Sequence, residues 1–109
     1  GTNLTSAGLP GVIKAWGHVD VSSPINVEPS YNVASVVSNS TGKYDVTFTN
    51  ALPSANYVVS LSVQTNVSSN HYTLCYYNRT TTGFQVQKFL NGALDSGASG
   101  NFSFVIYQA

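Results

Sequence analysis

Large apolar and polar residues alternate along much of the chain, with a period of two. The alternation is clearest where Tyr44, Val46 and Phe48 are separated by polar residues, and it returns at residues 57–63 after a loop that contains Pro53. In an extended strand this period places the apolar side chains on one face. The pattern therefore predicts two strands joined as a hairpin, each with an apolar face that another layer must cover.

The same period predicts further strands, with turn residues between them. They cover residues 12–19, 33–37, 71–77, 84 onward and 102–107, with residues 25–28 as an edge strand or loop between two prolines. Asn91-Gly92 is the strongest two-residue hairpin signal in the chain. No segment has a convincing helical period. About seven to eight short strands predict an all-β protein, an antiparallel β-sandwich or a closed barrel, and we favour the sandwich.

The chain of 109 residues is long enough for one domain with a real core. Residues 1–10 are mostly small and polar and include Gly and Pro, a composition that is typical of a linker or the remnant of a shaft. We expect residues 11–109 to form the folded domain.

The first and last predicted strands carry apolar residues on both faces. In the first strand, Ile13, Ala15, Gly17 and Val19 alternate with Val12, Lys14, Trp16 and His18. In the last strand, Phe102, Phe104 and Ile106 form one row, and Val105 and Tyr107 lie opposite. An isolated domain normally presents polar groups on its outer face. We therefore expect an interface between subunits at Val12, Trp16, Val105 and Tyr107.

Charge excludes several partners. Only 7% of the residues are charged, the formal net charge is zero, and the four basic residues are scattered. A nucleic-acid site or a polybasic membrane patch needs clustered Lys and Arg. No apolar run approaches the roughly 20 residues that span a membrane. We expect neither nucleic-acid binding nor membrane insertion, and a net charge near zero favours self-association.

Residues for catalysis or metal binding are sparse. The chain lacks a G-x-S-x-G motif, and its few carboxylates do not suggest a catalytic pair. His18 and Asp20 share one face of a strand, but two ligands do not make a metal site. We expect no enzyme activity, cofactor or metal. The single cysteine, Cys75, lies between Leu74 and Tyr76, and we expect it to be a small buried residue.

Two polar loops, residues 66–72 and 76–82, flank the strand at 71–77 and suit recognition. Tyr77 can stack on a sugar ring, while Asn78 and Arg79 can fix its hydroxyl groups. In the other loop, the candidate contacts are Asn70, His71 and Tyr72. The alternative is a tyrosine-rich core strand followed by an ordinary polar turn.

Four ordered segments resemble the C-terminal domain of bacteriophage tail fibres. They are Lys14-Ala15-Trp16, the segment SYNVASV at 30–36, the segment TGKYDVTFTNALPSANY at 41–57 and the segment TTGFQV at 81–86. The resemblance spans roughly residues 11 to 108. It implies an intertwined homotrimer at the fibre tip of a virion. Such a tip binds the bacterial surface through a polysaccharide (capsule or lipopolysaccharide) or an outer-membrane protein.

Two other functions stay open at this point. The domain could trimerise and cap a fibre whose recognition residues lie elsewhere. Without the resemblance, the chain reads as a monomeric, secreted, lectin-like sandwich, which would bind glycans without forming an oligomer.

Overall fold

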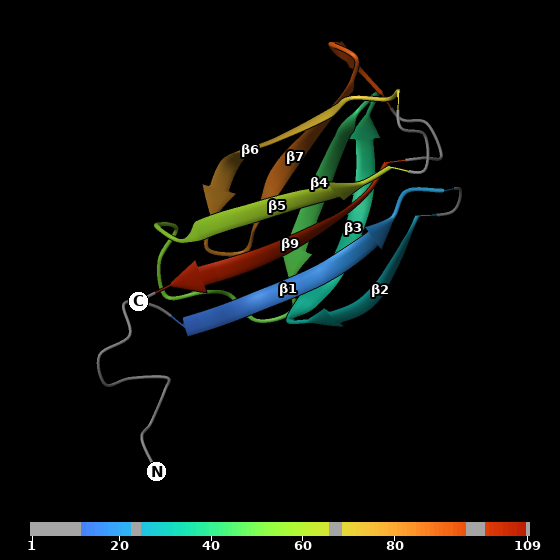
Figure 1. Ribbon diagram of the computed structural model, residues 1–109. Coiled ribbons are helices and arrows are strands. Elements are labelled where there is room, and N and C mark those ends of the chain that lie inside the picture. Colours follow the sequence, from blue (N-terminus) through green and yellow to red (C-terminus); the bar gives the residue numbers. More distant parts are fainter. Residues whose placement is uncertain (1–11, 23–24, 66–68, 96–99, 109) are drawn as a thin grey trace.

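The computed structural model describes residues 12–22, 25–65, 69–95 and 100–108, and these residues form two antiparallel sheets. The strands are β1 (Val12–Asp20), β2 (Asn26–Tyr31), β3 (Val33–Ser40), β4 (Lys43–Phe48), β5 (Val58–Gln64), β6 (Tyr72–Thr80), β7 (Gly83–Leu90), β8 (Ala93–Leu94) and β9 (Asn101–Gln108). One sheet has the order β2-β1-β9-β5, and the other has the order β3-β4-β7-β6 with β8 beside β7. The prediction of an all-β fold is confirmed, and the arrangement is that of a β-sandwich (Figure 1).

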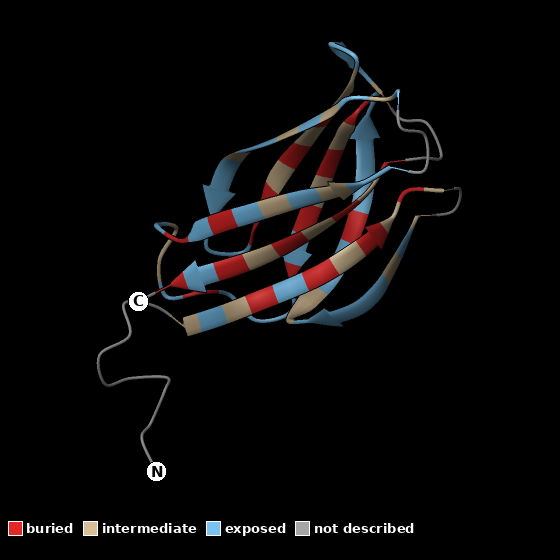
Figure 2. Ribbon diagram, in the orientation of Figure 1, coloured by how far each residue is buried: buried red, intermediate tan, exposed pale blue. Residues whose placement is uncertain are grey.

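The core lies between the two sheets, where buried and more exposed residues alternate along the central strands (Figure 2). The predicted inward row of Phe102, Phe104 and Ile106 is confirmed, since each is at most 1% exposed. Ring contacts join the sheets: the centroids of Phe84 and Phe104 lie 5.5 Å apart, as do those of Tyr44 and Phe102. Burial of such large aromatic side chains is the main favourable term in the stability of the sandwich.

The predicted hairpin between residues 43–48 and 57–64 is wrong. Strand β4 pairs with β3 and β7, whereas β5 pairs with β9 in the other sheet. The connection between them crosses the sandwich, and the Leu52 N–H donates to the Thr81 carbonyl (2.8 Å) on the way. Period-two alternation reports which face of a strand is apolar but not which strand lies beside it. Both strands bury that face, from opposite sides of the core.

A bulge in β1 changes which residues face outward near its start. Ile13 pairs with Tyr107 and Ala15 with Ile106, so Lys14 is an extra residue in the ladder. Ala15 and Val19 face the core as expected, but Ile13 is 49% exposed. Val12 pairs with the buried Gln108 and therefore lies on the inner side, because directly paired residues share a face. The predicted faces of Val12 and Ile13 are thus exchanged.

Two turns depend on residues with positive φ. Asn91 and Gly92, with φ of 51° and 93°, join β7 to β8 as the sequence predicted. Asn32, with φ of 59°, joins β2 to β3 and thereby links the two sheets. Its side chain accepts from the Asn50 N–H (2.8 Å) and donates to the carbonyls of Lys14 and Asn50 (3.1 Å each). Asn tolerates this backbone conformation better than most residues.

Candidate functional site

Strand β6 carries most of the recognition residues that the sequence suggested. It lies at an edge of its sheet, next to β7. The expected loop after residue 77 is shorter than predicted, because the strand continues to Thr80 through a bulge at which Asn78 has a φ of 52°. Asn is one of the few non-glycine residues that readily adopt this conformation, so the strand absorbs an extra residue without ending.

Tyr77 and Asn78 lie on the outer face of the five-stranded sheet. Tyr77 is paired with Gln85, which is in turn paired with Asp45, and both Gln85 and Asp45 alternate with buried residues along their strands. The Asn78 Nδ2 donates to Gln85 Oε1 (2.5 Å), and the Gln85 Nε2 donates to Asp45 Oδ1 (2.7 Å). Three neighbouring strands therefore hold a connected row of amide and carboxylate groups beside a tyrosine.

A groove of about 290 Å³ follows this row. Its lining residues are Asp45, Val46, Thr47, Asn78, Thr80, Thr82, Gly83, Phe84 and Gln85. We call it the outer-face groove. The hydroxyls of Thr80 and Thr82 lie 3.1 Å apart at the turn between β6 and β7, so hydroxyl, amide and carboxylate groups all line one concave surface.

Arg79 does not join Tyr77 and Asn78. Its guanidinium group donates to the Tyr57 carbonyl and lies 5.9 Å from the ring centroids of Tyr57 and Tyr76. These contacts connect β6 to the residue that precedes β5, across the edge of the sandwich. Arg79 therefore bridges the two sheets rather than lining the outer-face groove.

The residues from the other predicted loop lie at the far end of β6. The Tyr72 ring packs against Gly100, where an added Cβ would lie 2.6 Å from it. His71 is tied to Asn91 by two hydrogen bonds, at 2.8 Å and 2.9 Å, through its carbonyl and N–H groups. Asn70 directly precedes them and is half-buried. The six candidate residues are thus divided between the two ends of one strand and do not form one cluster.

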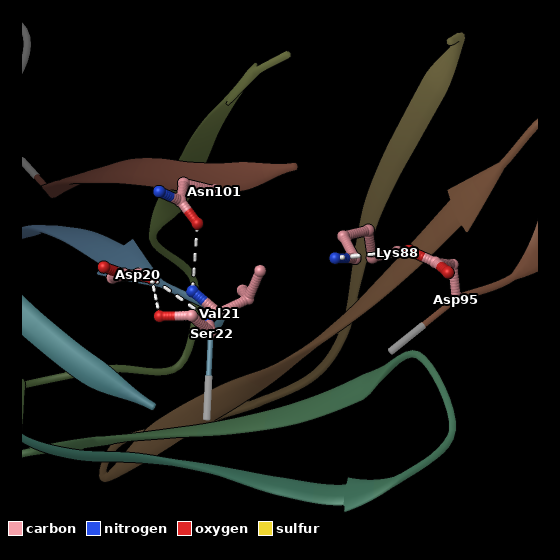
Figure 3. A network of polar contacts seen from close by, with 6 residues as sticks. All are labelled: Asp20, Val21, Ser22, Lys88, Asp95 and Asn101. Atoms are coloured by element: carbon pink, nitrogen blue, oxygen red, sulfur yellow. Dashed lines mark hydrogen bonds and ion pairs between the residues drawn. The ribbon is translucent and has the colours of Figure 1, made fainter. Parts of the chain in front are cut away.

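A buried ion pair lies near that far end. Lys88 is fully buried, and its Nζ lies 3.4 Å from Asp95 Oδ2 (Figure 3). The same Nζ lies 5.6 Å from the centroid of the Tyr72 ring. Burial lowers the pKa of Lys88, and the Asp95 carboxylate partly opposes that shift. This pair could not be predicted from the sequence, because Lys88 occupies an inward position in the alternation of β7.

A second polar group surrounds the end of β1 (Figure 3). The Ser22 hydroxyl and N–H donate to Asp20 Oδ1 at 2.6 Å and 2.9 Å, and these bonds lower the pKa of Asp20. The Asn101 Oδ1 accepts from the Val21 N–H (3.0 Å). His18 Nδ1 lies 2.8 Å from the Ser103 hydroxyl. Within the described ranges no three His, Cys, Asp or Glu residues come together as a metal site.

The outer face of the four-stranded sheet is apolar near the start of β1 and the end of β9. Two rows cross it: Tyr31, Trp16 and Val105 are cross-strand neighbours, and so are Ile13, Tyr107 and Val58. Five of these six side chains are between 39% and 60% exposed, and Val105 is half-buried. We call this set the apolar outer face. Trp16, Val105 and Tyr107 could be predicted from the sequence, but Tyr31 and Val58 could not, because their places beside β1 and β9 depend on strand order.

Cys75 is exposed, and the prediction of a buried cysteine is wrong. It pairs with Gln87 on the outer face of the five-stranded sheet, and its Sγ lies 3.4 Å from Gln87 Oε1. Its neighbours Leu74 and Tyr76 have the inward orientation, so Cys75 faces outward by alternation. Apolar neighbours in sequence are no guide to burial in a strand.

No family model matches the chain, and neither a curated protein nor a solved structure matches it. Among the residues that the structure describes, no helix has the length and apolar character needed to cross a membrane.

Proposed function

We propose that this chain is a non-enzymatic adhesion module that works as a homotrimer at the tip of a bacteriophage tail fibre. There it binds the surface of the bacterial host, through a polysaccharide or an outer-membrane protein. The observation that carries the proposal is the contrast between the two outer faces of the sandwich. One face is apolar, and the other carries a polar groove.

The apolar outer face supports self-association. Trp16 and Tyr107 are 40% and 39% exposed, and Val58 is 60% exposed, at adjoining positions on three paired strands. Contiguous exposed apolar surface of this kind marks an interaction site in soluble proteins. With a formal net charge of zero, the chain has little self-repulsion to oppose contact between identical copies.

The polar face supports binding of a hydrated ligand. The outer-face groove offers amides, hydroxyls and one carboxylate, and it lies on the sheet opposite the apolar outer face. A trimer that buries the apolar face of each copy would leave three such grooves exposed. Three weak contacts on one fibre raise the overall affinity without new chemistry, provided that all three reach the cell at once.

Adsorption of the purified protein to bacteria tests the proposal. Fluorescently labelled protein is mixed with a panel of bacterial strains, and bound protein is measured by flow cytometry, with and without purified lipopolysaccharide or capsule as competitor. We expect saturable binding to some strains and its loss upon competition. Assembly without binding to any strain would favour the alternative, a domain that caps the fibre. Binding by a monomer would favour the secreted lectin-like alternative.

A further inference from the structure

We propose that the outer-face groove is a binding site for a neutral saccharide, with Asp45 and Gln85 as its central hydrogen-bonding residues and Tyr77 as its stacking surface. This inference rests on the proposed binding function and deepens it, because it names the site and the chemical class of the ligand. It moves the centre of recognition from β6 itself to Asp45 and Gln85 on β4 and β7, beside the end of β6 that carries Asn78 and Thr80.

The groove matches the chemistry of a pyranose ring. A sugar presents neighbouring hydroxyl groups that both donate and accept, and it is held best by side chains that supply both functions in fixed positions. Asp45 is an acceptor when ionised. The Gln85 amide has two N–H donors, one of which is directed to Asp45 Oδ1, and Asn78 adds a second amide. Thr80 and Thr82 contribute hydroxyls at the same edge.

The polar groups are held in place before a ligand arrives. Gln85 is fixed between two partners, because its oxygen accepts from Asn78 and its nitrogen donates to Asp45. The Asn39 Nδ2 also lies 3.4 Å from Asp45 Oδ1, so the carboxylate is held from two sides. Because a carboxylate can accept about four hydrogen bonds, it retains capacity for sugar hydroxyls. Preorganised groups lose less conformational entropy when a ligand binds.

Gly83 lines the groove, and Tyr77 lies next to it, outside the lining but paired with the lining residue Gln85. Tyr77 is the cross-strand neighbour of Gln85 on the outer face, which places an aromatic side chain beside the amide. Aromatic rings pack against the C–H faces of sugars, while polar neighbours bind the hydroxyls. At Gly83 an added Cβ would lie 2.0 Å from the Val46 carbonyl oxygen, so this part of the lining must remain backbone. Any other residue at position 83 would force β4 and β7 apart.

The charge of the lining selects neutral sugars. Asp45 is the only charged residue among the groove's lining residues. An ionised carboxylate repels the carboxylate of a uronic or sialic acid, whereas it accepts hydrogen bonds from a neutral hexose. Lys43 lies one row further along β4, opposite Gln87, and is not among the lining residues.

Two glutamines on one strand make a matched pair for the test. Gln85 and Gln87 are both half-buried on the outer face of β7, but only Gln85 lines the groove. The wild type and the variants Gln85→Ala, Gln87→Ala, Asp45→Asn, Tyr77→Ala and Tyr77→Phe are titrated on an array of bacterial polysaccharides and their component mono- and disaccharides. Thermal unfolding of each variant confirms that it is folded.

We expect the wild type to bind neutral saccharides and to discriminate against acidic ones. Gln85→Ala, Asp45→Asn and Tyr77→Ala should weaken binding about tenfold or more, and Gln87→Ala by less than about twofold. Tyr77→Phe should retain most of the binding, because stacking needs the ring alone. Equal effects of Gln85→Ala and Gln87→Ala, or a preference for acidic sugars, would overturn the inference.

Adsorption to cells, measured on the same variants, separates this inference from the proposed function. If the wild type adsorbs to bacteria and Gln85→Ala and Asp45→Asn adsorb equally well, the module binds its receptor elsewhere and the groove is not the site. If the wild type binds neither cells nor any saccharide on the array, both proposals fail.

Discussion

Removal of Asp95 should destabilise the sandwich through its effect on Lys88. Lys88 is fully buried, and its Nζ lies 3.4 Å from the Asp95 carboxylate, whose side chain is 22% exposed. Asp95→Ala leaves the buried ammonium group without this countercharge. Loss of one member of a buried ion pair costs about 3–5 kcal/mol. Because water partly reaches Asp95, we expect the lower part of this range or less, about 2–3 kcal/mol.

The double variant distinguishes a buried charge from simple loss of contact. Lys88→Met combined with Asp95→Ala removes both charges and keeps an apolar chain of similar length at position 88. Replacement of a buried pair by apolar residues is often neutral or stabilising, so the double variant should be more stable than Asp95→Ala alone. Glu28→Ala, which removes an exposed carboxylate from β2, serves as control and should change stability by less than about 0.5 kcal/mol.

Urea unfolding at pH 7, followed by tryptophan fluorescence and far-ultraviolet circular dichroism, measures these free energies. The pH dependence gives a second readout. The pKa of Lys88 is lower in the folded protein than its ordinary value of 10.5. Between these two pKa values the unfolded state binds more protons than the folded state. The free energy of unfolding should therefore rise with pH across this window. The rise should be larger in Asp95→Ala, since the carboxylate no longer favours the charged amine.

Two results would refute this reasoning. The first is a change of less than about 0.5 kcal/mol in Asp95→Ala, which is the size of an ordinary surface substitution. The second is a double variant as unstable as the single one. Either would mean that Lys88 does not carry an uncompensated charge when Asp95 is removed.

Three further predictions concern the polar groups that hold the strands together. Tyr57→Phe should lower stability by about 1–2 kcal/mol, since it removes a hydroxyl 2.7 Å and 3.0 Å from two carbonyls. Burial raises the pKa of Tyr57 to about 12, so the wild type should lose stability as pH rises from about 10 to 12, and Tyr57→Phe should lose less there. Asn32→Ala should destabilise more than Asn32→Gly in urea unfolding, because Gly keeps the positive φ although both variants lose the side-chain hydrogen bonds; equal losses would show that φ is unimportant there. Ser22→Ala should raise the pKa of Asp20 toward its ordinary value in an NMR titration, and an unchanged pKa would contradict the assigned hydrogen bond.

The faces of most strands could be predicted from the sequence. The row of Phe102, Phe104 and Ile106 and the row of Tyr44, Val46 and Phe48 are buried as alternation predicted. Alternation failed at Ile13, where the bulge after it adds a residue to the ladder. A single extra residue reverses every face beyond it, and nothing in a hydrophobic pattern marks such a position.

The candidate site was harder to predict than the fold. Tyr77 and Asn78 were found from residue type alone, but Asp45 and Gln85 were not, although they form the centre of the groove. They are 40 residues apart, and they meet because β4 pairs with β7. The sequence did not predict that pairing, because its pattern favoured a hairpin between β4 and β5. The contact of Arg79 with Tyr57, away from Asn78, could not be predicted either, because the bulge at Asn78 leaves no mark in the sequence.

Sedimentation equilibrium of the purified chain most directly tests the claim that the apolar outer face is covered by other copies. We expect a particle of three times the chain mass of 11.5 kDa at micromolar concentration. The double variant Trp16→Ser/Tyr107→Ser should shift it toward monomer. Val37→Ser, which replaces a 51% exposed valine on the other sheet, should leave it trimeric. A folded wild-type chain that remains monomeric at all accessible concentrations would contradict the account.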